Sequence, residues 1–283
     1  MRRASSRAAA SYGEAAVLAR EVEARMLERL QYIKLAPGRI LDAGCGDGHG
    51  VRRLAENFSE AQILGLDFAC PMLRAAPGGD GWLRRAFKRG RVDYLCADFA
   101  RVPLPAASVD LVWSNLAFHC AGDPQLAFRE LRRVLKVGGL LMFSCYGPDT
   151  LKELKAAFSA HDGEPHVHDF IDMHDLGDML SVCGFSAPVM DMEVITLTYA
   201  DVDALCADLR ATGQQNAAAG RRRGLTGKGV FGAMRAEYEK SRRAGRLQAS
   251  FEIVYGHAWK PETRASDDGR AIVKMPSPRA KRA

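Results

Sequence analysis

The stretch ILDAGCGDGHG, residues 40–50, has a glycine at every second position after an apolar run. Gly44, Gly46 and Gly48 cost backbone entropy, so we expect the segment to use the freedom of glycine for a tight turn and a close approach by a ligand. The spacing is GxGxG, preceded by Asp42, and differs from the GxGxxG of dinucleotide-binding turns. The pattern therefore favours a nucleotide-like ligand that is not a dinucleotide.

Two acids follow at the ends of the next two apolar segments. Asp67 ends QILGLD, and Asp98 stands in CADF beside Phe99. An ionised carboxylate fixed at a strand tip accepts hydrogen bonds from both hydroxyls of a ribose. An acid that accepts from an exocyclic amine, next to an apolar ring, suits adenine. Asp98 has a second interpretation, because aspartate also caps turns. Together these residues predict a nucleoside site.

Strands and helices must alternate to bring these residues together. The apolar segments predict strands over residues 39–44, 62–69, 92–99, 109–118 and 140–146. Helices are predicted over 48–57, from Pro71, and over 124–139, the last closed by Gly138 and Gly139. This alternation predicts an α/β fold with a mostly parallel, doubly wound sheet. Ligands of such sheets bind at the carboxyl ends of the strands.

The rest of the chain extends this core on both sides. An amphipathic helix is predicted at about 14–33, and the cofactor core spans about 38–148. A helical cap and closing strands follow over about 149–260, with helices at 149–160, 172–183, 201–212 and 230–243 and strands at 189–199 and 250–259. We expect a single domain over 1–262. Residues 263–283 are polar and basic, which predicts a flexible tail.

Composition narrows the class of protein. The chain has 283 residues, is 47% hydrophobic and carries a formal charge of +6, which is too mild to indicate nucleic-acid binding. No apolar run approaches the roughly 18 residues of a membrane span. Seven cysteines, an odd number without a CxxC pair, argue against a metal site or a disulfide framework and favour a reducing compartment. Basic clusters at 84–91 and 221–228 are either solvated surface or a dock for an acidic partner.

Five segments together resemble the class I S-adenosylmethionine-dependent methyltransferases over about residues 38–146: LDAGCGDG, LGLD, CADF, VDLVWSNLAFHC and RELRRVLKVGGLLMFS. The resemblance implies a Rossmann-like fold, S-adenosylmethionine as the cofactor, S-adenosylhomocysteine as its product, and no metal. The cofactor-binding residues that it implies are Asp42, Gly44, Gly46, Gly48, Asp67, Asp98, Phe99 and Asn115.

Further segments resemble the malonyl-acyl-carrier-protein O-methyltransferases of early biotin synthesis: RAAASY, WSNLAFHC, GPDTLKEL, HVHDFIDMHDLGDML and SFEIVYGHAWK. The resemblance implies methyl transfer to the free carboxylate of a malonyl group, carried by phosphopantetheine on an acidic acyl-carrier protein. The first residues, rich in Arg, Ala and Ser, partly resemble a mitochondrial transit peptide. The expected compartment is the cytoplasm, or the mitochondrial matrix if the chain is eukaryotic.

An ionised carboxylate needs no general base, so the expected work of the enzyme is alignment and exclusion of water. Tyr12 either closes over the cofactor, as the family resemblance implies, or anchors the first helix. His119 either donates a hydrogen bond to the acceptor or packs against a lid. Arg221, Arg222 and Arg223 are candidates for binding the carboxylate, the phosphopantetheine phosphate or the carrier, unless they are solvated surface.

Two alternatives remain open at this point. LRATGQQNAAAGRRRGL and SFEIVYGHAWK are also similar to the mitochondrial complex I assembly factor that hydroxylates an arginine. The second alternative is a methyltransferase-like RNA-binding module that uses the two basic clusters. This hypothesis predicts a steep salt dependence of RNA affinity.

Overall fold

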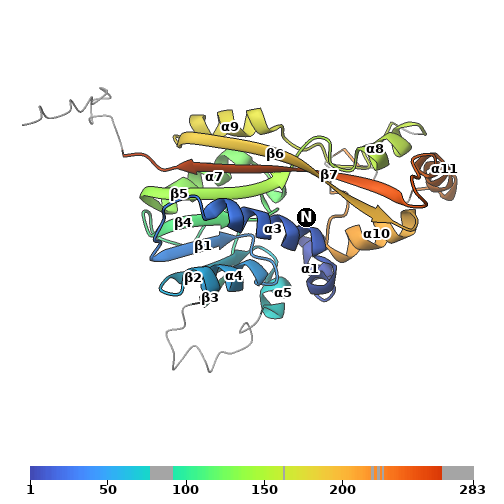
Figure 1. The fold of residues 1–283 in the computed structure, drawn as a ribbon. Coiled ribbons are helices and arrows are strands. Elements are labelled where there is room, and N and C mark those ends of the chain that lie inside the picture. Colours follow the sequence, from blue (N-terminus) through green and yellow to red (C-terminus); the bar gives the residue numbers. More distant parts are fainter. Residues whose placement is uncertain (77–91, 162, 218–219, 222–223, 225, 263–283) are drawn as a thin grey trace, which may run out of the picture.

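The structure is a computed structural model that describes residues 1–76, 92–161, 163–217, 220–221, 224 and 226–262. Within this part of the chain, seven strands form one sheet in the order β3-β2-β1-β4-β5-β7-β6 (Figure 1). The strands are β1 (Arg39–Ala43), β2 (Gln62–Asp67), β3 (Val92–Cys96), β4 (Val109–Ser114), β5 (Leu135–Tyr146), β6 (Ser186–Tyr199) and β7 (Leu247–Trp259). Strands β1 to β5 pair in parallel, and β7 runs antiparallel to β5 and β6. The expected mostly parallel sheet is confirmed.

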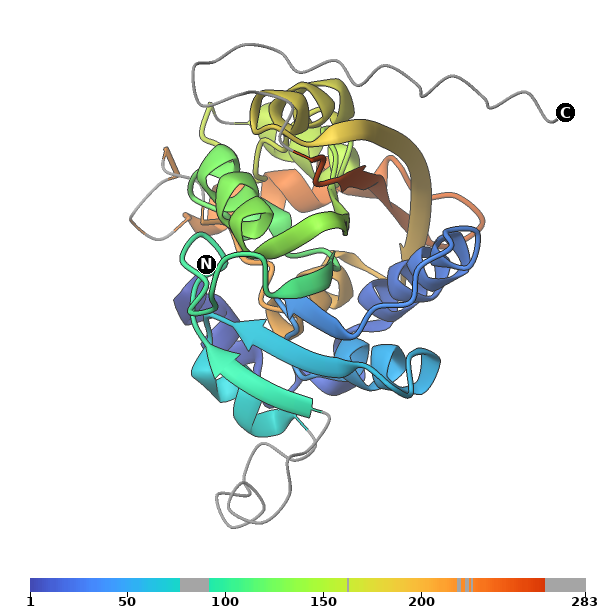
Figure 2. The ribbon, with the colours of Figure 1, turned by 90° about the vertical axis from the view of Figure 1, so that its left-hand side faces the viewer.

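Helices cover both faces of this sheet. They are α1 (Arg2–Ala8), α2 (Tyr12–Ala15), α3 (Val17–Leu30), α4 (His49–Asn57), α5 (Cys70–Ala75), α7 (Pro124–Val134), α8 (Lys152–Ser159), α9 (Met173–Val182), α10 (Val202–Ala211) and α11 (Lys228–Glu239). Figure 2 shows α3 and α4 on one side of the sheet and α7 on the other. Successive residues of a strand point to opposite faces. Accordingly Ile40 packs in the core under α3 and Leu41 in the core under α7.

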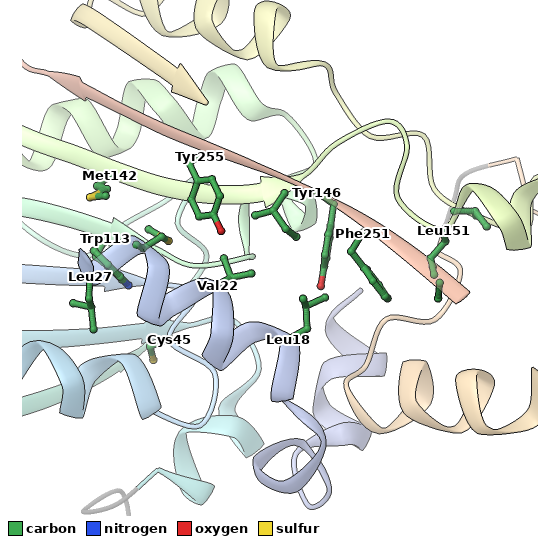
Figure 3. Close-up of a cluster of buried hydrophobic side chains, with 14 of the residues drawn as sticks. Leu18, Val22, Leu27, Cys45, Trp113, Met142, Tyr146, Leu151, Phe251 and Tyr255 are labelled. Carbon is green, nitrogen blue, oxygen red and sulfur yellow. The ribbon is translucent and has the colours of Figure 1, made fainter. Parts of the chain in front are cut away.

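Helix α3 is fixed to the sheet by an apolar stripe. Leu18 and Val22 lie one turn apart on α3 and point toward Tyr146 and Phe251 (Figure 3). Burial of each such side chain contributes about 1.5–3 kcal/mol. The helix expected over 14–33 is divided into α2 and α3, because Ala16 has a non-helical backbone, and it ends at Leu30. This packing holds the polar side of α3 next to the glycine turn.

The expected cap helices are present as α8, α9, α10 and α11, and α10 and α11 connect β6 to β7. Some boundaries are wrong: the strand expected over 109–118 ends at Ser114, and α7 ends at Val134, where Leu135 begins β5 by pairing with Val109. Gly138 and Gly139 therefore lie in β5, and the Gly138 N–H donates to Lys260 O at 2.8 Å. The tail at 263–283 lies outside the described residues. None of the described helices is long and apolar enough to cross a membrane.

Candidate active site

The glycine turn joins β1 to α4 in a left-handed backbone. The φ angles of Gly44, Gly46 and Gly48 are +89°, +54° and +76°. A Cβ on Gly44 would lie 2.2 Å from the Ala117 Cβ, so glycine is needed there by the protein's own packing. A Cβ on Gly46 would lie 3.4 Å from the Tyr12 ring. Ala117, in the segment after β4, therefore packs against Gly44, and the Tyr12 ring lies next to Gly46.

Asp67, at the end of β2, is buried against this turn. One carboxylate oxygen, Oδ2, accepts the Gly46 N–H at 3.0 Å, and Oδ1 accepts the Ala69 N–H at 2.7 Å. Burial raises the pKa of Asp67, and the two backbone hydrogen bonds act in the opposite direction. Each carboxylate oxygen has a second lone pair. Asp67 lines a pocket together with Gly44, Gly46 and Phe99 at the carboxyl edge of the sheet.

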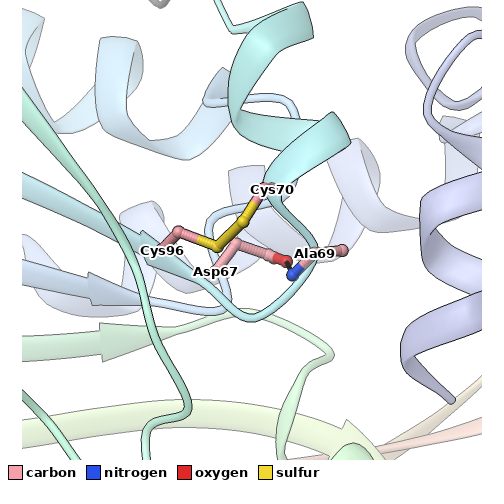
Figure 4. Close-up of a disulfide and its surroundings, with 4 residues drawn as sticks. All are labelled: Asp67, Ala69, Cys70 and Cys96. Atoms are coloured by element: carbon pink, nitrogen blue, oxygen red, sulfur yellow. Dashed lines mark hydrogen bonds between the residues drawn. A yellow bond between two sulfur atoms is a disulfide. The ribbon is translucent and has the colours of Figure 1, made fainter.

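A disulfide between Cys70 and Cys96 lies beside Asp67 (Figure 4). The expectation from the cysteine count was wrong for this pair. Parallel pairing of β2 with β3 sets Cys96 opposite Asp67, and Cys70 begins α5 just beyond the tip of β2. Their Cα atoms are therefore 5.5 Å apart. The remaining five cysteines are free thiols, three of them buried, as expected for small apolar residues.

Of the other two residues of the expected nucleoside site, Phe99 lines the Asp67 pocket and Asp98 does not. Phe99 is buried, lines the Asp67 pocket and stacks on Phe118, with ring centroids 5.6 Å apart. Asp98 is exposed, and its Oδ1 accepts the Ala100 N–H at 2.9 Å, which is the turn cap that its alternative interpretation predicted. Asp98 is not among the described residues that line the Asp67 pocket.

The Asn115 amide is occupied within the protein. Its Nδ2 donates to Ala19 O at 2.7 Å, and its Oδ1 accepts from Ser144 Oγ at 2.8 Å. Asn115 thus joins α3 to β5. It also lines both the Asp67 pocket and a smaller, more polar pocket on the other side of Gly44. Asn115 was predicted to bind the cofactor, but its two side-chain hydrogen bonds described above are made within the protein.

The smaller pocket is lined by charged residues of α3 and of the glycine turn. Asp42 is 2% exposed, and burial together with nearby Glu23 raises its pKa well above the ordinary range. Glu23 contacts His49 Nδ1 at 3.1 Å through Oε1, and burial raises its pKa as well. A cation between these two buried carboxyl groups would stabilise their ionised forms, so this pocket favours a positively charged group.

Arg20 stands on the same side of α3 and lines the same small pocket. One guanidinium nitrogen, Nη2, donates to Gly13 O. Nε is buried and has no hydrogen-bond partner within the described part of the chain. A buried, unpaired N–H is costly, so it marks a site for an acceptor from outside the protein. Reasoning from sequence missed both Arg20 and Glu23, because charges on an amphipathic helix are typical of its solvated face.

A larger cavity of about 380 Å³ lies beyond the Asp67 pocket, and its walls are mostly apolar. They include Tyr146, Leu151, Leu154, Phe158, Val167, Phe170 and Phe231. Met1, His119 and Gln214 line both spaces, so the boundary between the cavity and the Asp67 pocket lies at these three residues. His119, a candidate from the sequence, therefore lies between the Asp67 pocket and this cavity.

Polar groups at this boundary are neutral. Burial, with His168 nearby, lowers the pKa of His119 to about 3. Its Nδ1 is buried and has no partner among the described residues. Tyr146 Oη accepts from Gln214 Nε2, and burial raises the Tyr146 pKa, so its own O–H stays protonated. The boundary thus offers hydrogen-bond donors without a fixed positive charge.

Two arginines line the outer part of the cavity. Arg221 was expected near the acceptor, and Arg210 was not singled out from the sequence. Both are exposed, which places them where the cavity reaches the surface. Arg222, Arg223 and the cluster at 84–91 lie outside the described residues. Tyr12 lines the Asp67 pocket and the small polar pocket, and burial raises its pKa.

Known proteins resemble this chain in sequence and in fold. A family model for a methyltransferase domain matches residues 41–143. The YcgJ protein of Bacillus subtilis has a TM-score of 0.58 at 15% identity, over 84% of this chain and 98% of that chain. A phosphoethanolamine N-methyltransferase of Haemonchus contortus, solved with S-adenosylhomocysteine, has a TM-score of 0.51 at 21% identity, over 85% of this chain and 52% of that one. These structures share the class I fold.

Sequence similarity is closer to a single group of enzymes. The malonyl-[acyl-carrier protein] O-methyltransferase of Gallionella capsiferriformans is 53% identical over 97% of this chain and 94% of its own length. The enzyme of the same name from Methylovorus is 50% identical over 99% of this chain and 95% of its own length. Similarity of this extent includes the glycine turn, the cap and both closing strands. The chain therefore belongs to the malonyl-[acyl-carrier protein] O-methyltransferase family.

Proposed function

We propose that the protein transfers the methyl group of S-adenosylmethionine to the free carboxylate of a malonyl thioester borne by an acyl-carrier protein, as a step toward biotin. One observation carries the proposal: His119 lies at the boundary between the glycine-turn pocket and an apolar cavity of about 380 Å³. Near full-length similarity to enzymes named for this reaction supports the choice of acceptor. The same similarity favours it over the hydroxylase and RNA-binding hypotheses.

The described residues fit the cofactor. Glu23 and Asp42 would hold its ammonium group, since a cation between them relieves the cost of two buried acids. The unpaired Arg20 Nε would donate to its carboxylate. Asp67 has free lone pairs for ribose hydroxyls, and Phe99 offers an apolar wall for the adenine. When bound, the cofactor supplies an electrophilic methyl group on a sulfonium.

The acceptor carboxylate is ionised at neutral pH, so no residue has to remove a proton. His119 fits this requirement, because its low pKa keeps it neutral. We assign to the neutral imidazole an N–H donated to one carboxylate oxygen, which leaves the other oxygen to attack. A guanidinium at this point would stabilise the carboxylate more before the reaction than in the transition state, where its charge is being lost. Neutral donors orient the nucleophile at a smaller cost in reactivity.

Apolar walls add to the rate in the proposed reaction. A sulfonium and a carboxylate neutralise each other as the methyl moves, so the transition state carries less separated charge than the reactants. An environment without water therefore favours the transition state. Tyr146 and Phe170 flank His119, with ring centroids 4.9 Å and 6.0 Å from the imidazole. Tyr12 completes the enclosure on the glycine-turn side. These side chains exclude water from the path between the two pockets.

The test uses purified full-length protein, S-adenosylmethionine and malonyl-acyl-carrier protein, with intact-mass spectrometry of the carrier. We expect a mass gain of one methyl group that base hydrolysis removes, as for an ester. Malonyl-pantetheine serves as the acceptor without a carrier. No gain with either acceptor contradicts the proposal. A gain of one oxygen on an arginine of a test protein would favour the hydroxylase alternative instead.

A further inference from the structure

Helix α1 has two unlike faces. Met1 and Ser5 line the Asp67 pocket, and Ala8 packs in a small cluster with Ala69 and Met72. Residues three or four apart share one face of a helix, so positions 1, 5 and 8 point inward together. The three arginines of this helix, Arg2, Arg3 and Arg7, are exposed on the outer face. The helix therefore adjoins the Asp67 pocket through Met1 and Ser5 and presents three guanidinium groups to the outside.

These three arginines have no ion pair or side-chain hydrogen bond within the described part of the chain. Helix α1 contains no acid of its own. Some arginines elsewhere on the surface are paired: Arg29 contacts Asp191 at 3.0 Å, and Arg242 contacts Glu239 at 2.7 Å. No described acid thus forms an ion pair with the three arginines of α1.

A fourth arginine of the same kind lies next to α1. The Ser11 hydroxyl, just after α1, donates to Ala211 O at 3.0 Å, and a Cβ on Gly213 would lie 3.2 Å from Ser5 Cα. These contacts hold the end of α10 against α1, and Figure 1 shows the two helices side by side. Arg210 near the end of α10 is exposed, lines the large cavity and has no ion pair in the described residues. Met1, which precedes α1, lines the same cavity, so α1 and Arg210 both adjoin it.

We propose that Arg2, Arg3, Arg7 and Arg210 form the docking surface for the acyl-carrier protein. This inference rests on the proposed function. A substrate tethered to an acidic protein must present the origin of its arm at the mouth of the acceptor cavity. Guanidinium groups bind carboxylates in bidentate fashion, and an unpaired set of them steers an acidic partner toward that mouth. Because α1 adjoins the Asp67 pocket, a docked carrier also holds this helix in place.

The experiment reverses the charge of α1 in the full chain, with any purification tag at the carboxyl terminus. The variant Arg2→Glu/Arg3→Glu/Arg7→Glu is compared with Lys34→Glu/Arg52→Glu/Arg129→Glu, which reverses three exposed charges elsewhere and changes the net charge equally. Each is assayed with malonyl-acyl-carrier protein and with malonyl-pantetheine, which carries the thioester without protein or phosphate. Thermal unfolding checks the fold, and a triple Arg→Gln variant replaces the Glu variant if that one is unstable.

We expect the α1 variant to raise KM for malonyl-acyl-carrier protein by about tenfold or more, with kcat and the malonyl-pantetheine reaction changed less than about twofold. Raising the salt concentration should raise the wild-type KM toward that of the variant. An equal rise in the control variant overturns the docking surface, and so does an unchanged KM, even if the variant loses affinity for RNA. If the wild-type chain methylates neither malonyl-pantetheine nor malonyl-acyl-carrier protein, the proposed function itself is overturned.

Discussion

The imidazole of His119 and the phenol of Tyr146 lie with ring centroids 4.9 Å apart at the boundary of the two pockets. Both groups are kept neutral by burial, which lowers the pKa of His119 and raises that of Tyr146. Gln214 donates to the Tyr146 oxygen and leaves the phenol O–H to donate elsewhere. The two side chains together present neutral donors to one small volume, and that is the environment in which a carboxylate remains a nucleophile.

The first prediction concerns His119. We expect His119→Ala to lower kcat for malonyl transfer by roughly tenfold, the loss of one neutral hydrogen bond in a dry site. His119→Gln, which keeps an N–H donor, should retain more of the rate. S-adenosylmethionine affinity by calorimetry should change little in either variant. The rate of the wild-type enzyme should show no step near the ordinary histidine pKa, and a bell-shaped profile centred there would contradict the assignment.

The second prediction concerns stability in acid. Unfolded His119 takes up a proton below about pH 6.5, whereas the folded side chain stays neutral down to about pH 3. The unfolded state therefore binds more protons in this window, and its free energy falls relative to the folded state as the pH decreases. The stability contributed by neutral His119 is complete above pH 6.5. At pH 5 about 2 kcal/mol of it should be lost, since one pH unit corresponds to about 1.4 kcal/mol.

Urea unfolding of the wild type and of His119→Gln at pH 7 and pH 5 measures this difference. The variant should lose less stability on acidification, by about 2 kcal/mol. His168 and His257 also have lowered pKa values and remain in both proteins, so their contribution cancels in the comparison. Equal losses in the two proteins would show that His119 accepts a proton without unfolding.

Most of the fold was predictable, because the period of the apolar residues differs between strands and helices. Segments such as VDLVWS are continuous runs, and the stripe of Leu18, Val22 and Met26 has helical spacing. The rule that the ends of parallel strands meet at one edge also predicted that Asp67 and Phe99 lie near the glycine turn, and they line one pocket with it. Gly138 and Gly139 have the same sequence signature as a helix end, but they lie in β5, because Leu135 and Leu140 on either side pair with β4 and both glycines hydrogen-bond to Lys260.

The parts that sequence could not supply depend on contacts between distant segments. Cys70 and Cys96 meet because of the register between β2 and β3, which no count of cysteines contains. Arg20 and Glu23 have the pattern of a solvated helix face until α3 is laid against the glycine turn. Arg210 lies next to α1 through the hydrogen bond between Ser11 and Ala211, which join distant segments of the chain.

The third prediction tests the glycine turn. Gly44→Ala should lower the free energy of unfolding by about 3 kcal/mol. The backbone at φ +89° is left-handed, which disfavours alanine, and the added Cβ would lie 2.2 Å from the Ala117 Cβ. Gly138→Ala is the matched control, because Gly138 has φ +75° but no atom within 4 Å of the added Cβ. It should cost only about 1 kcal/mol. Chemical denaturation of both variants gives the comparison, and equal costs would mean that the contact with Ala117 relaxes freely.

The fourth prediction concerns the redox state of the pair beside Asp67. Thiol titration of the unfolded chain without reductant should count five free thiols, and seven after reduction. Reduction should lower the free energy of unfolding by about 3 kcal/mol, because it releases a loop between residues 26 positions apart. The variant Cys70→Ser/Cys96→Ser should match the reduced protein. Seven thiols before reduction would exclude the bridge under those conditions.

The fifth prediction separates the two acids of the expected nucleoside site. Asp67 is buried and bonded to the glycine turn, whereas Asp98 is exposed and caps its own turn. Asp67→Ala removes an acceptor for ribose and also frees the Gly46 N–H, so S-adenosylmethionine affinity by calorimetry should fall by a hundredfold or more, roughly 3 kcal/mol.

Asp98→Ala should cost about tenfold at most if its carboxylate acts only as a cap, since an exposed turn contributes about 1 kcal/mol. Asp67→Asn keeps one acceptor oxygen, so its loss of S-adenosylmethionine affinity should lie between those of Asp67→Ala and Asp98→Ala. A loss at Asp98 as large as that at Asp67 would mean that the exposed carboxylate turns toward the adenine when the cofactor binds. In that case the turn cap and the cofactor contact are two states of the same side chain, and its hydrogen bond to Ala100 is given up on binding.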